Sequence, residues 1–101
     1  MPQKAFKPSD QVLYVPDHVK DQIDPDNLAA ALDIPDVEAG FVTGPAGEGS
    51  YFCRYWRKDN PGELRTTANS EATSGRDLVA YQIMPWTKIR MVMKRLGYID
   101  K

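Results

Sequence analysis

The pattern of hydrophobic and polar positions predicts short strands over most of the chain and an amphipathic helix near its end. β-Branched and aromatic residues occur in short runs separated by Gly, Pro, Asn and Asp, which is typical of strands joined by turns. Five strands are predicted on this basis, at residues 11–15, 38–43, 50–56, 64–67 and 77–81. The glycine-rich stretch 44–49 predicts the turn of a central β-hairpin, and the small, polar stretch 68–75 predicts a loop.

A short helical insertion is predicted over residues 25–32, between the first two strands. Asp24 is suited to capping its first turn, and Pro25 fits the first helical position. Leu28 and Leu32 are four residues apart and share one face. A helix of this length is not stable alone, so its stability would depend on packing against another element.

The C-terminal helix, predicted over residues 85–97, has an apolar face and a basic face. Gly97 is placed to end it. At 100° per residue, the apolar side chains that gather in one stripe are Trp86, Ile89, Val92, Met93 and Leu96. The opposite arc holds Lys88, Arg90, Lys94 and Arg95, with Met91 among them. Two arrangements fit this pattern: the stripe caps the open end of a small barrel, or the helix projects and docks into a partner or a second copy.

These elements together predict a mainly β (α+β) fold, a small SH3-like antiparallel barrel of about five strands. The barrel is expected over residues 8–81, with the insertion 25–32 inside it and the helix 85–97 after it. A chain of 101 residues has room for one small core. We therefore expect a single domain, 1–101.

Composition excludes several classes of protein. No apolar run approaches the roughly 18 residues of a transmembrane helix, and the first residues lack the apolar stretch of a secretory signal. Cys53 is the single cysteine and cannot form an internal disulfide, which favours a reducing, cytoplasmic setting. The formal net charge of −1 gives no strong attractive field for nucleic acid.

That net charge hides an uneven distribution. Residues 1–48 carry three Lys and nine acidic residues, whereas residues 86–101 carry five basic residues and one acid. This distribution has three interpretations. The acidic N-terminal part and the basic C-terminal part attract each other within one molecule, form ordinary solvated surface, or bind different partners.

The sequence offers little for catalysis or metal binding. His18 is the only histidine, and a zinc site needs three or four ligands. Cys53 lies mid-strand among aromatic residues, where an inert, partly buried thiol is expected rather than a nucleophile paired with His18. The stretch 44–49 lacks the Lys-Ser/Thr of a phosphate loop. We therefore expect no enzyme activity, no cofactor and no metal.

The candidate surface combines aromatic residues and cations on the third strand with the basic face of the C-terminal helix. Such a mixture stacks bases and neutralises phosphates, or forms a hot spot for protein binding. In a third interpretation Tyr55 or Trp56 belongs to the core and the cations cover its edge. The candidate partner-binding residues are Arg54, Trp56, Arg57, Lys58, Arg65, Lys88, Arg90, Met91, Lys94 and Arg95.

Four segments carry strand-and-turn motifs: Val12-Leu13-Tyr14-Val15-Pro16-Asp17-His18, Pro35-Asp36-Val37-Glu38-Ala39-Gly40-Phe41-Val42-Thr43, Phe52-Cys53-Arg54-Tyr55 and Asp77-Leu78-Val79. In this order they resemble a set of small phage and prophage proteins that share V-Y-x-P-x-H, H-P-D-C-E-x-G-x-V, V-F-V-R-Y and x-D-L-V. The resemblance covers about residues 10–81 and implies an SH3-like barrel. Ile34 and Val37 stand where those proteins often have His and Cys, so that pair cannot bind a metal here.

The expectation from residues and resemblance is a non-enzymatic, phage-type binding module that acts by protein–protein interaction in the host bacterial cytoplasm. Its partner would be a host or phage protein. Inhibition of a host defence or housekeeping factor is one form that this binding function could take. The alternative is a nucleic-acid-binding barrel, in which the third strand contacts bases and the basic helix contacts phosphates. Self-association through the C-terminal helix is a further option, and membrane binding is not expected.

Overall fold

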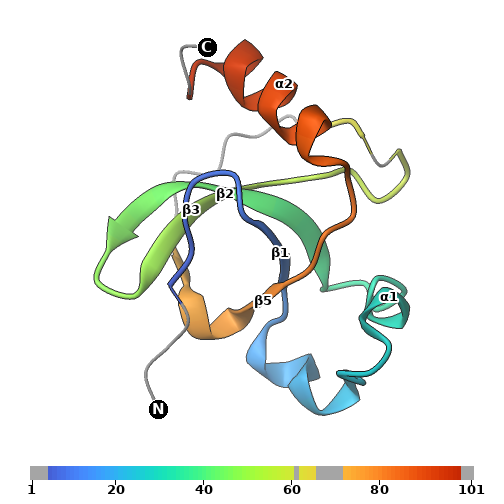
Figure 1. Cartoon of the computed structure of the whole chain (residues 1–101). Coiled ribbons are helices and arrows are strands. Elements are labelled where there is room, and N and C mark those ends of the chain that lie inside the picture. Colours follow the sequence, from blue (N-terminus) through green and yellow to red (C-terminus); the bar gives the residue numbers. More distant parts are fainter. Residues whose placement is uncertain (1–4, 61, 66–71, 99–101) are drawn as a thin grey trace.

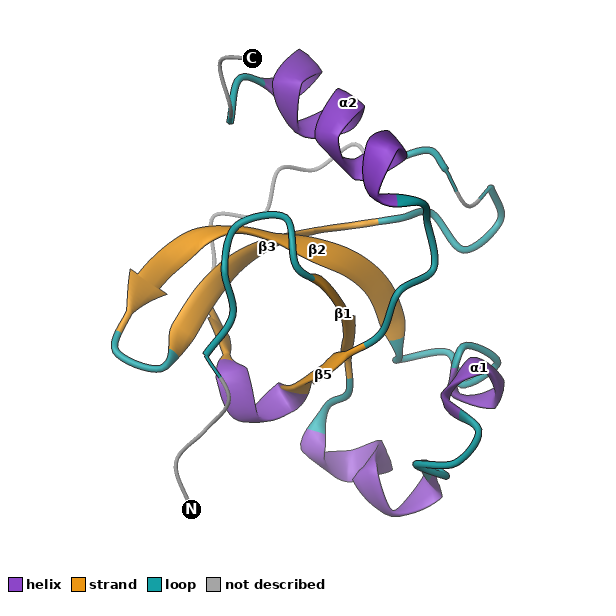
Figure 2. Ribbon diagram, in the orientation of Figure 1, coloured by secondary structure: helices purple, strands orange, loops and turns teal. Residues whose placement is uncertain are grey.

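The computed structural model describes residues 5–60, 62–65 and 72–98, and in this part of the chain five strands form one antiparallel sheet with the order β4-β3-β2-β1-β5 (Figure 1). The strands are β1 (Gln11–Tyr14), β2 (Glu38–Gly47), β3 (Ser50–Tyr55), β4 (Thr73–Ser74) and β5 (Leu78–Ala80). Two 3-10 helices and two α-helices complete the fold (Figure 2): η1 (Asp17–Gln22), α1 (Leu28–Ala31), η2 (Gly75–Asp77) and α2 (Trp86–Leu96). The α+β class is as predicted.

The hairpin of β2 and β3 is longer than its sequence suggests. The predicted turn 44–49 is wrong over most of its length, because β2 continues to Gly47 and pairs with Ser50. The register shifts between Val42 and Gly44 and again between Pro45 and Gly47. Such irregularities bend a strand and increase its twist. β2 therefore keeps pairing through a segment whose Gly and Pro content is typical of a turn.

The sheet is strongly curled but open. β4 and β5 lie at opposite edges, yet only the three residues of η2 separate them. The edges of a flat five-stranded sheet lie about 19 Å apart at the usual strand spacing. The four steps from Ser74 to Leu78 span at most about 14 Å, so the sheet has to curl. No pairing joins β4 to β5 among the described residues, so the five-stranded sheet is curled but not closed into a barrel.

Both faces of the sheet are covered, and each face has its own core. The inner core lies on the face opposite α2 and contains Phe6, Val12, Val42, Tyr51, Cys53, Tyr55 and Leu78. The helix-side core faces α2 and the η1–α1 segment and contains Leu13, Val15, Val19, Ala31, Val37, Ala39, Phe41, Trp56, Ile89, Val92 and Met93. The alternation of β1 separates Val12 from Leu13 in this way. Figure 1 shows α2 on the outer side of the curl.

The predicted fourth strand at 64–67 is not found where it can be checked. Leu64 forms only an isolated bridge with Trp56, and residues 66–67 lie outside the described residues. The strand that pairs with β3 is instead β4, Thr73–Ser74, which lies in the predicted loop 68–75. Two small polar residues give no strand pattern. The sequence therefore could not predict that Thr73 pairs with Tyr51 and Ser74 with Ser50.

The insertion contains less α-helix than predicted. α1 begins at Leu28 rather than Pro25, because the Asp24 carboxylate accepts a hydrogen bond from the Asp26 backbone N–H at 2.9 Å in a local turn. The prediction for the two leucines is confirmed, since Leu28 and Leu32 both pack against the helix-side core. The segment before it, predicted only as a connection, forms η1.

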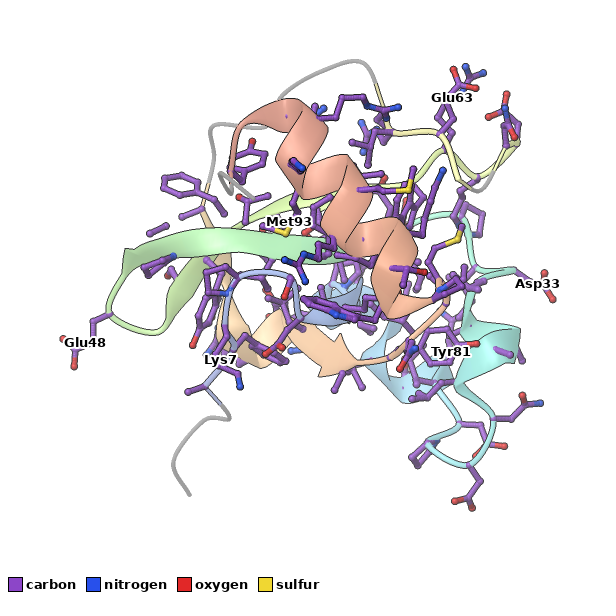
Figure 3. All side chains as sticks on the ribbon, turned by 45° about the horizontal axis from the view of Figure 1, so that its top comes forward. Lys7, Asp33, Glu48, Glu63, Tyr81 and Met93 are labelled. Carbon is purple, nitrogen blue, oxygen red and sulfur yellow. The ribbon has the colours of Figure 1, made fainter. Side chains whose placement is uncertain are left out.

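The C-terminal helix matches its prediction closely. It runs from Trp86 to Leu96, and Gly97 ends it in the left-handed conformation with φ of 88°. Of its apolar stripe, Ile89, Val92 and Met93 are buried, and Met93 points from the helix toward the sheet (Figure 3). The helix does not project, and it does not cap the open end of a barrel either: its apolar stripe packs on the outer face of the curled sheet.

Candidate binding surface

Trp56 is not available for binding, which corrects the prediction. Its side chain is only 2% exposed and its ring packs against Phe41 with centroids 5.5 Å apart. Tyr55 is also buried, on the other face of the sheet. The sequence predicted that one of the two would point inward, and because both faces are covered, both do. Tyr55 and Trp56 are therefore lost to the strand-three surface, and the aromatic residue of β3 that stays exposed is Phe52, at 37%.

The Trp56 indole N–H is a buried donor without a hydrogen-bond acceptor among the described residues. Trp56 also lines a small cavity of about 80 Å³ together with Leu32, Ala39 and Ile83, with Arg57 and Lys58 completing the lining. An unsatisfied buried donor costs about 1–3 kcal/mol. Trp56 therefore contributes packing to the core at the expense of one unpaired polar atom.

The cations that follow Trp56 are held by groups of the same molecule. The Arg57 guanidinium contacts both carboxylate oxygens of Asp59, at 3.0 and 2.7 Å, and lies 3.5 Å from Glu63. The Asp59 carboxylate, through this hydrogen bond and charge, raises the pKa of Arg57. The Lys58 ammonium donates hydrogen bonds to the backbone carbonyls of residues 32, 34 and 35 at 3.1, 2.6 and 3.3 Å. Arg57 and Lys58 thus fix the loop after α1 and the turn after β3.

The remaining strand cations are also engaged. Arg65 forms an ion pair with Glu38 at the start of β2. Arg54 donates to the backbone carbonyl of Arg65 at 3.4 Å, a long hydrogen bond. The cluster of Arg54, Arg57, Lys58 and Arg65 therefore lies where it was predicted, around the end of β3, but each of its members donates to an acceptor of the same molecule.

The solvent-facing side of α2 differs from this cluster. Met91 is 65% exposed, in agreement with its predicted place on the basic arc. Lys88, Lys94 and Arg95 lie three or four residues from it and share its side of the helix. These three cations make no ion pair or hydrogen bond with the described residues. We call Lys88, Met91, Lys94 and Arg95 the α2 face, and Arg90 is exposed at its margin.

An open groove of about 430 Å³ lies beside β5, at the start of α2. Its lining residues are Phe6, Ser9, Asp10, Gln11, Ala80, Tyr81, Gln82 and Trp86. Trp86 was predicted in the apolar stripe that packs inward, but it is 53% exposed because it begins the helix, where it lines the groove. No local sequence pattern predicted this groove, because its lining joins residues that are far apart in the sequence.

The Gln11 side chain fixes one wall of the groove. Its Oε1 accepts hydrogen bonds from the backbone N–H groups of Ile83 and Met84 at 3.0 and 2.9 Å, and its Nε2 donates to the Met84 carbonyl at 2.7 Å. The Gln11 main-chain carbonyl accepts from Tyr81 N–H at 3.1 Å. One residue of β1 therefore sets the path of the chain from β5 into α2.

His18 and Cys53 occupy separate environments. His18 is exposed on η1, and its Nε2 lies 2.6 Å from Asp36 Oδ2. Cys53 is buried in the inner core, and burial raises the pKa of its thiol to about 11. Within the described ranges, no three His, Cys, Asp or Glu side chains are grouped so that they could hold a metal ion. The motif residues His18 and Asp36, which lie in different segments of the sequence, form a contact that holds η1 to the start of β2.

No protein-family model, curated protein or solved structure matches this chain. Among the described helices, none has the length and apolarity that crossing a membrane requires. The geometry of the site is therefore the basis for any functional assignment.

Proposed function

We propose that the protein is a non-enzymatic binding module that docks the α2 face onto an acidic protein surface with an apolar pocket. The observation that carries this proposal is the exposure of Met91 at the centre of three cations that make no ion pair or hydrogen bond with the described residues. Methionine is flexible and polarisable, so it fills irregular pockets well. The surrounding cations steer an acidic partner and select its orientation.

The rigidity of α2 supports this assignment. Ile89, Val92 and Met93 anchor the opposite side of the helix in the helix-side core, and Gly97 ends it. A face on a packed helix loses less conformational entropy on binding than a face on a free segment does. Met91 and its neighbours are therefore presented in one arrangement before the partner arrives.

The nucleic-acid alternative has lost part of its basis. Tyr55 and Trp56, which were expected to stack bases, are buried. Arg57 and Arg65 are paired with carboxylates of the same chain. Of the cations that this alternative assigned to nucleic acid, Lys88, Lys94 and Arg95 make no ion pair or hydrogen bond with the described residues, and an apolar residue lies at the centre of their face. Nucleic-acid binding is accordingly an outcome of the test and not a second proposal.

The resemblance to phage and prophage proteins adds the biological setting of the proposal. In this setting the partner is a host or phage protein in the host bacterial cytoplasm, and this rests on the sequence motifs alone. We also propose that the fold is an SH3-like variant whose sheet stays open. The strand order and the short η2 connection between the edge strands support this assignment.

The experiment is comparative capture from the cells in which the protein occurs. The wild type, Met91→Glu and Arg95→Glu are immobilised in parallel with Lys7→Glu, a charge reversal matched to Arg95→Glu at an exposed site outside the α2 face. We expect one acidic protein to be retained by the wild type and by Lys7→Glu. Its affinity, measured with purified components, should fall at least about tenfold in Met91→Glu and Arg95→Glu and should decrease with salt.

Two results would overturn the proposal. One is a partner whose affinity for Met91→Glu equals that for the wild type. The other is salt-sensitive binding of a labelled single- or double-stranded oligonucleotide that Lys94→Glu abolishes, without an acidic protein partner. The second result would establish the nucleic-acid alternative. Circular dichroism of each variant shows whether the fold is intact.

A further inference from the structure

We infer that the groove beside β5 binds an alkylammonium group, carried by a small molecule or by a basic side chain of another protein. This site is separate from the α2 face and does not depend on the function proposed for it. The groove, of about 430 Å³, is large enough for a tetraalkylammonium group. Its lining combines aromatic rings with a carboxylate, which is the chemistry that recognises such cations.

The aromatic part of the site is formed by Trp86 and Tyr81. Trp86 is 53% exposed, so much of its ring faces solvent at the groove. Tyr81 is half-buried and lines the same groove from the end of β5, and Figure 3 shows it near the start of α2. The electron-rich faces of indole and phenol rings attract a cation that can shed its water, and quaternary ammonium groups shed water readily.

Asp10 supplies the charge that selects a cation. Among the described residues that line the groove it is the only charged one. One oxygen of its carboxylate accepts a hydrogen bond from the Lys7 backbone N–H at 2.8 Å. Its main chain is held on both sides, because Asp10 N–H donates to the Lys7 carbonyl at 3.0 Å and its carbonyl accepts from Val42 N–H at 2.8 Å. The carboxylate is therefore fixed in place.

Gln11 connects the aromatic part to the acidic part. It follows Asp10 directly, its main chain holds Tyr81, and its side chain holds residues 83 and 84 just before α2. The positions of Asp10, Tyr81 and Trp86 are thus tied to one residue of β1. A site arranged before the ligand arrives binds more tightly than one that must be ordered.

The test is a titration followed by two-dimensional amide and indole NMR on the full chain. Tetramethylammonium is the first probe, and neopentyl alcohol, a neutral molecule of similar shape, is its control at matched salt. N-acetyl-lysine methylamide is the second cationic probe and represents a protein side chain. We expect saturable shifts at residues 80–86 with at least one cationic probe. The tighter of the two identifies the source of the ammonium group.

The variants locate the binding at the groove. Asp10→Asn keeps an oxygen for the Lys7 N–H and should weaken binding about tenfold, and Trp86→Leu should do the same. Tyr98→Leu removes an exposed aromatic ring from the other end of α2, and Met91→Glu alters the α2 face, so both should leave the affinity unchanged. Equal affinity for neopentyl alcohol, an unchanged affinity in Asp10→Asn, or the absence of saturable shifts with both cations would overturn the inference.

Discussion

Gly40 occupies the place in the sheet where a single methyl group should be most damaging. It lies on β2 between Val12 of β1 and Tyr55 of β3. A Cβ atom added at Gly40 would lie 2.0 Å from the Arg54 carbonyl oxygen and 2.8 Å from Cδ1 of the Tyr55 ring. Backbone atoms cannot rotate away as a flexible side chain does. Gly40→Ala therefore has to push β2 and β3 apart by about 1 Å, the distance needed to restore a contact of roughly 3 Å.

The cost of this displacement is set by the position of β2 in the sheet. β2 pairs with β1 on its other side, so it cannot move without breaking hydrogen bonds on one side or the other. Overpacking in a core costs about 1–3 kcal/mol, and a clash with backbone belongs at the upper end of that range. We expect Gly40→Ala to lower the free energy of unfolding by about 3 kcal/mol, out of about 5–15 kcal/mol for a typical domain.

Gly44→Ala is the matched control, four residues further along the same strand. No atom lies within 4 Å of a Cβ at this position, and its backbone does not require glycine. It should change stability by less than about 1 kcal/mol, with a tendency to stabilise because alanine restricts the unfolded chain. Urea unfolding followed by circular dichroism and by tryptophan fluorescence measures both variants. A Gly40→Ala midpoint equal to that of Gly44→Ala, with equal slopes, would refute the reasoning about the close approach of β2 and β3.

Three further predictions concern Lys58 and Cys53. Lys58→Met should lower the free energy of unfolding by about 1–2 kcal/mol because three carbonyls lose their common donor, whereas Lys88→Met should change it by less than about 0.5 kcal/mol. Equal effects in urea unfolding would contradict a structural role for Lys58. The raised pKa of Cys53 predicts that iodoacetamide at pH 8 modifies the thiol only as fast as the inner core opens. Modification at the rate of a free thiol would contradict the burial of Cys53. Stability should also fall as the pH rises from 9 to 11, because the unfolded thiol loses its proton before the folded one. At pH 11 the free energy of unfolding should be lower by about 2 kcal/mol because of this thiol. Cys53→Val should lack this decrease when the two proteins are compared by urea unfolding at each pH.

Local pattern was sufficient to predict β3, the first half of β2 and α2. Ile89, Val92 and Met93 recur at helical spacing, and Gly97 adopts the left-handed conformation in which glycine commonly ends a helix. The error at Trp56 arose because alternation assumes that a strand buries one face. Whether the second face is covered depends on α2, which lies about 30 residues later in the chain. No property of β3 itself distinguishes the two cases.

The candidate site was only partly predictable for a similar reason. The sequence correctly placed Met91 on the exposed face of α2, because helical spacing determines it. It could not show which cations are neutralised, since Arg65 pairs with Glu38, 27 positions away. The groove depends on tertiary structure alone: Asp10 and Trp86 are brought together by the pairing of β1 with β5. Charge patterns therefore gave candidates, and only the fold separated paired cations from available ones.

The burial of the sheet's outer face by α2 has a consequence for the protein during translation. Val92 follows Tyr55 by 37 positions, which a ribosome needs about 2–7 s to synthesise. Until α2 has been synthesised and has packed on the sheet, Leu13, Phe41 and Trp56 have no helix to cover them. The nascent chain thus exposes an apolar, strand-rich surface of the kind that chaperones bind. Slower elongation over the codons between β3 and α2 would lengthen this exposure and increase the fraction of chains lost to aggregation.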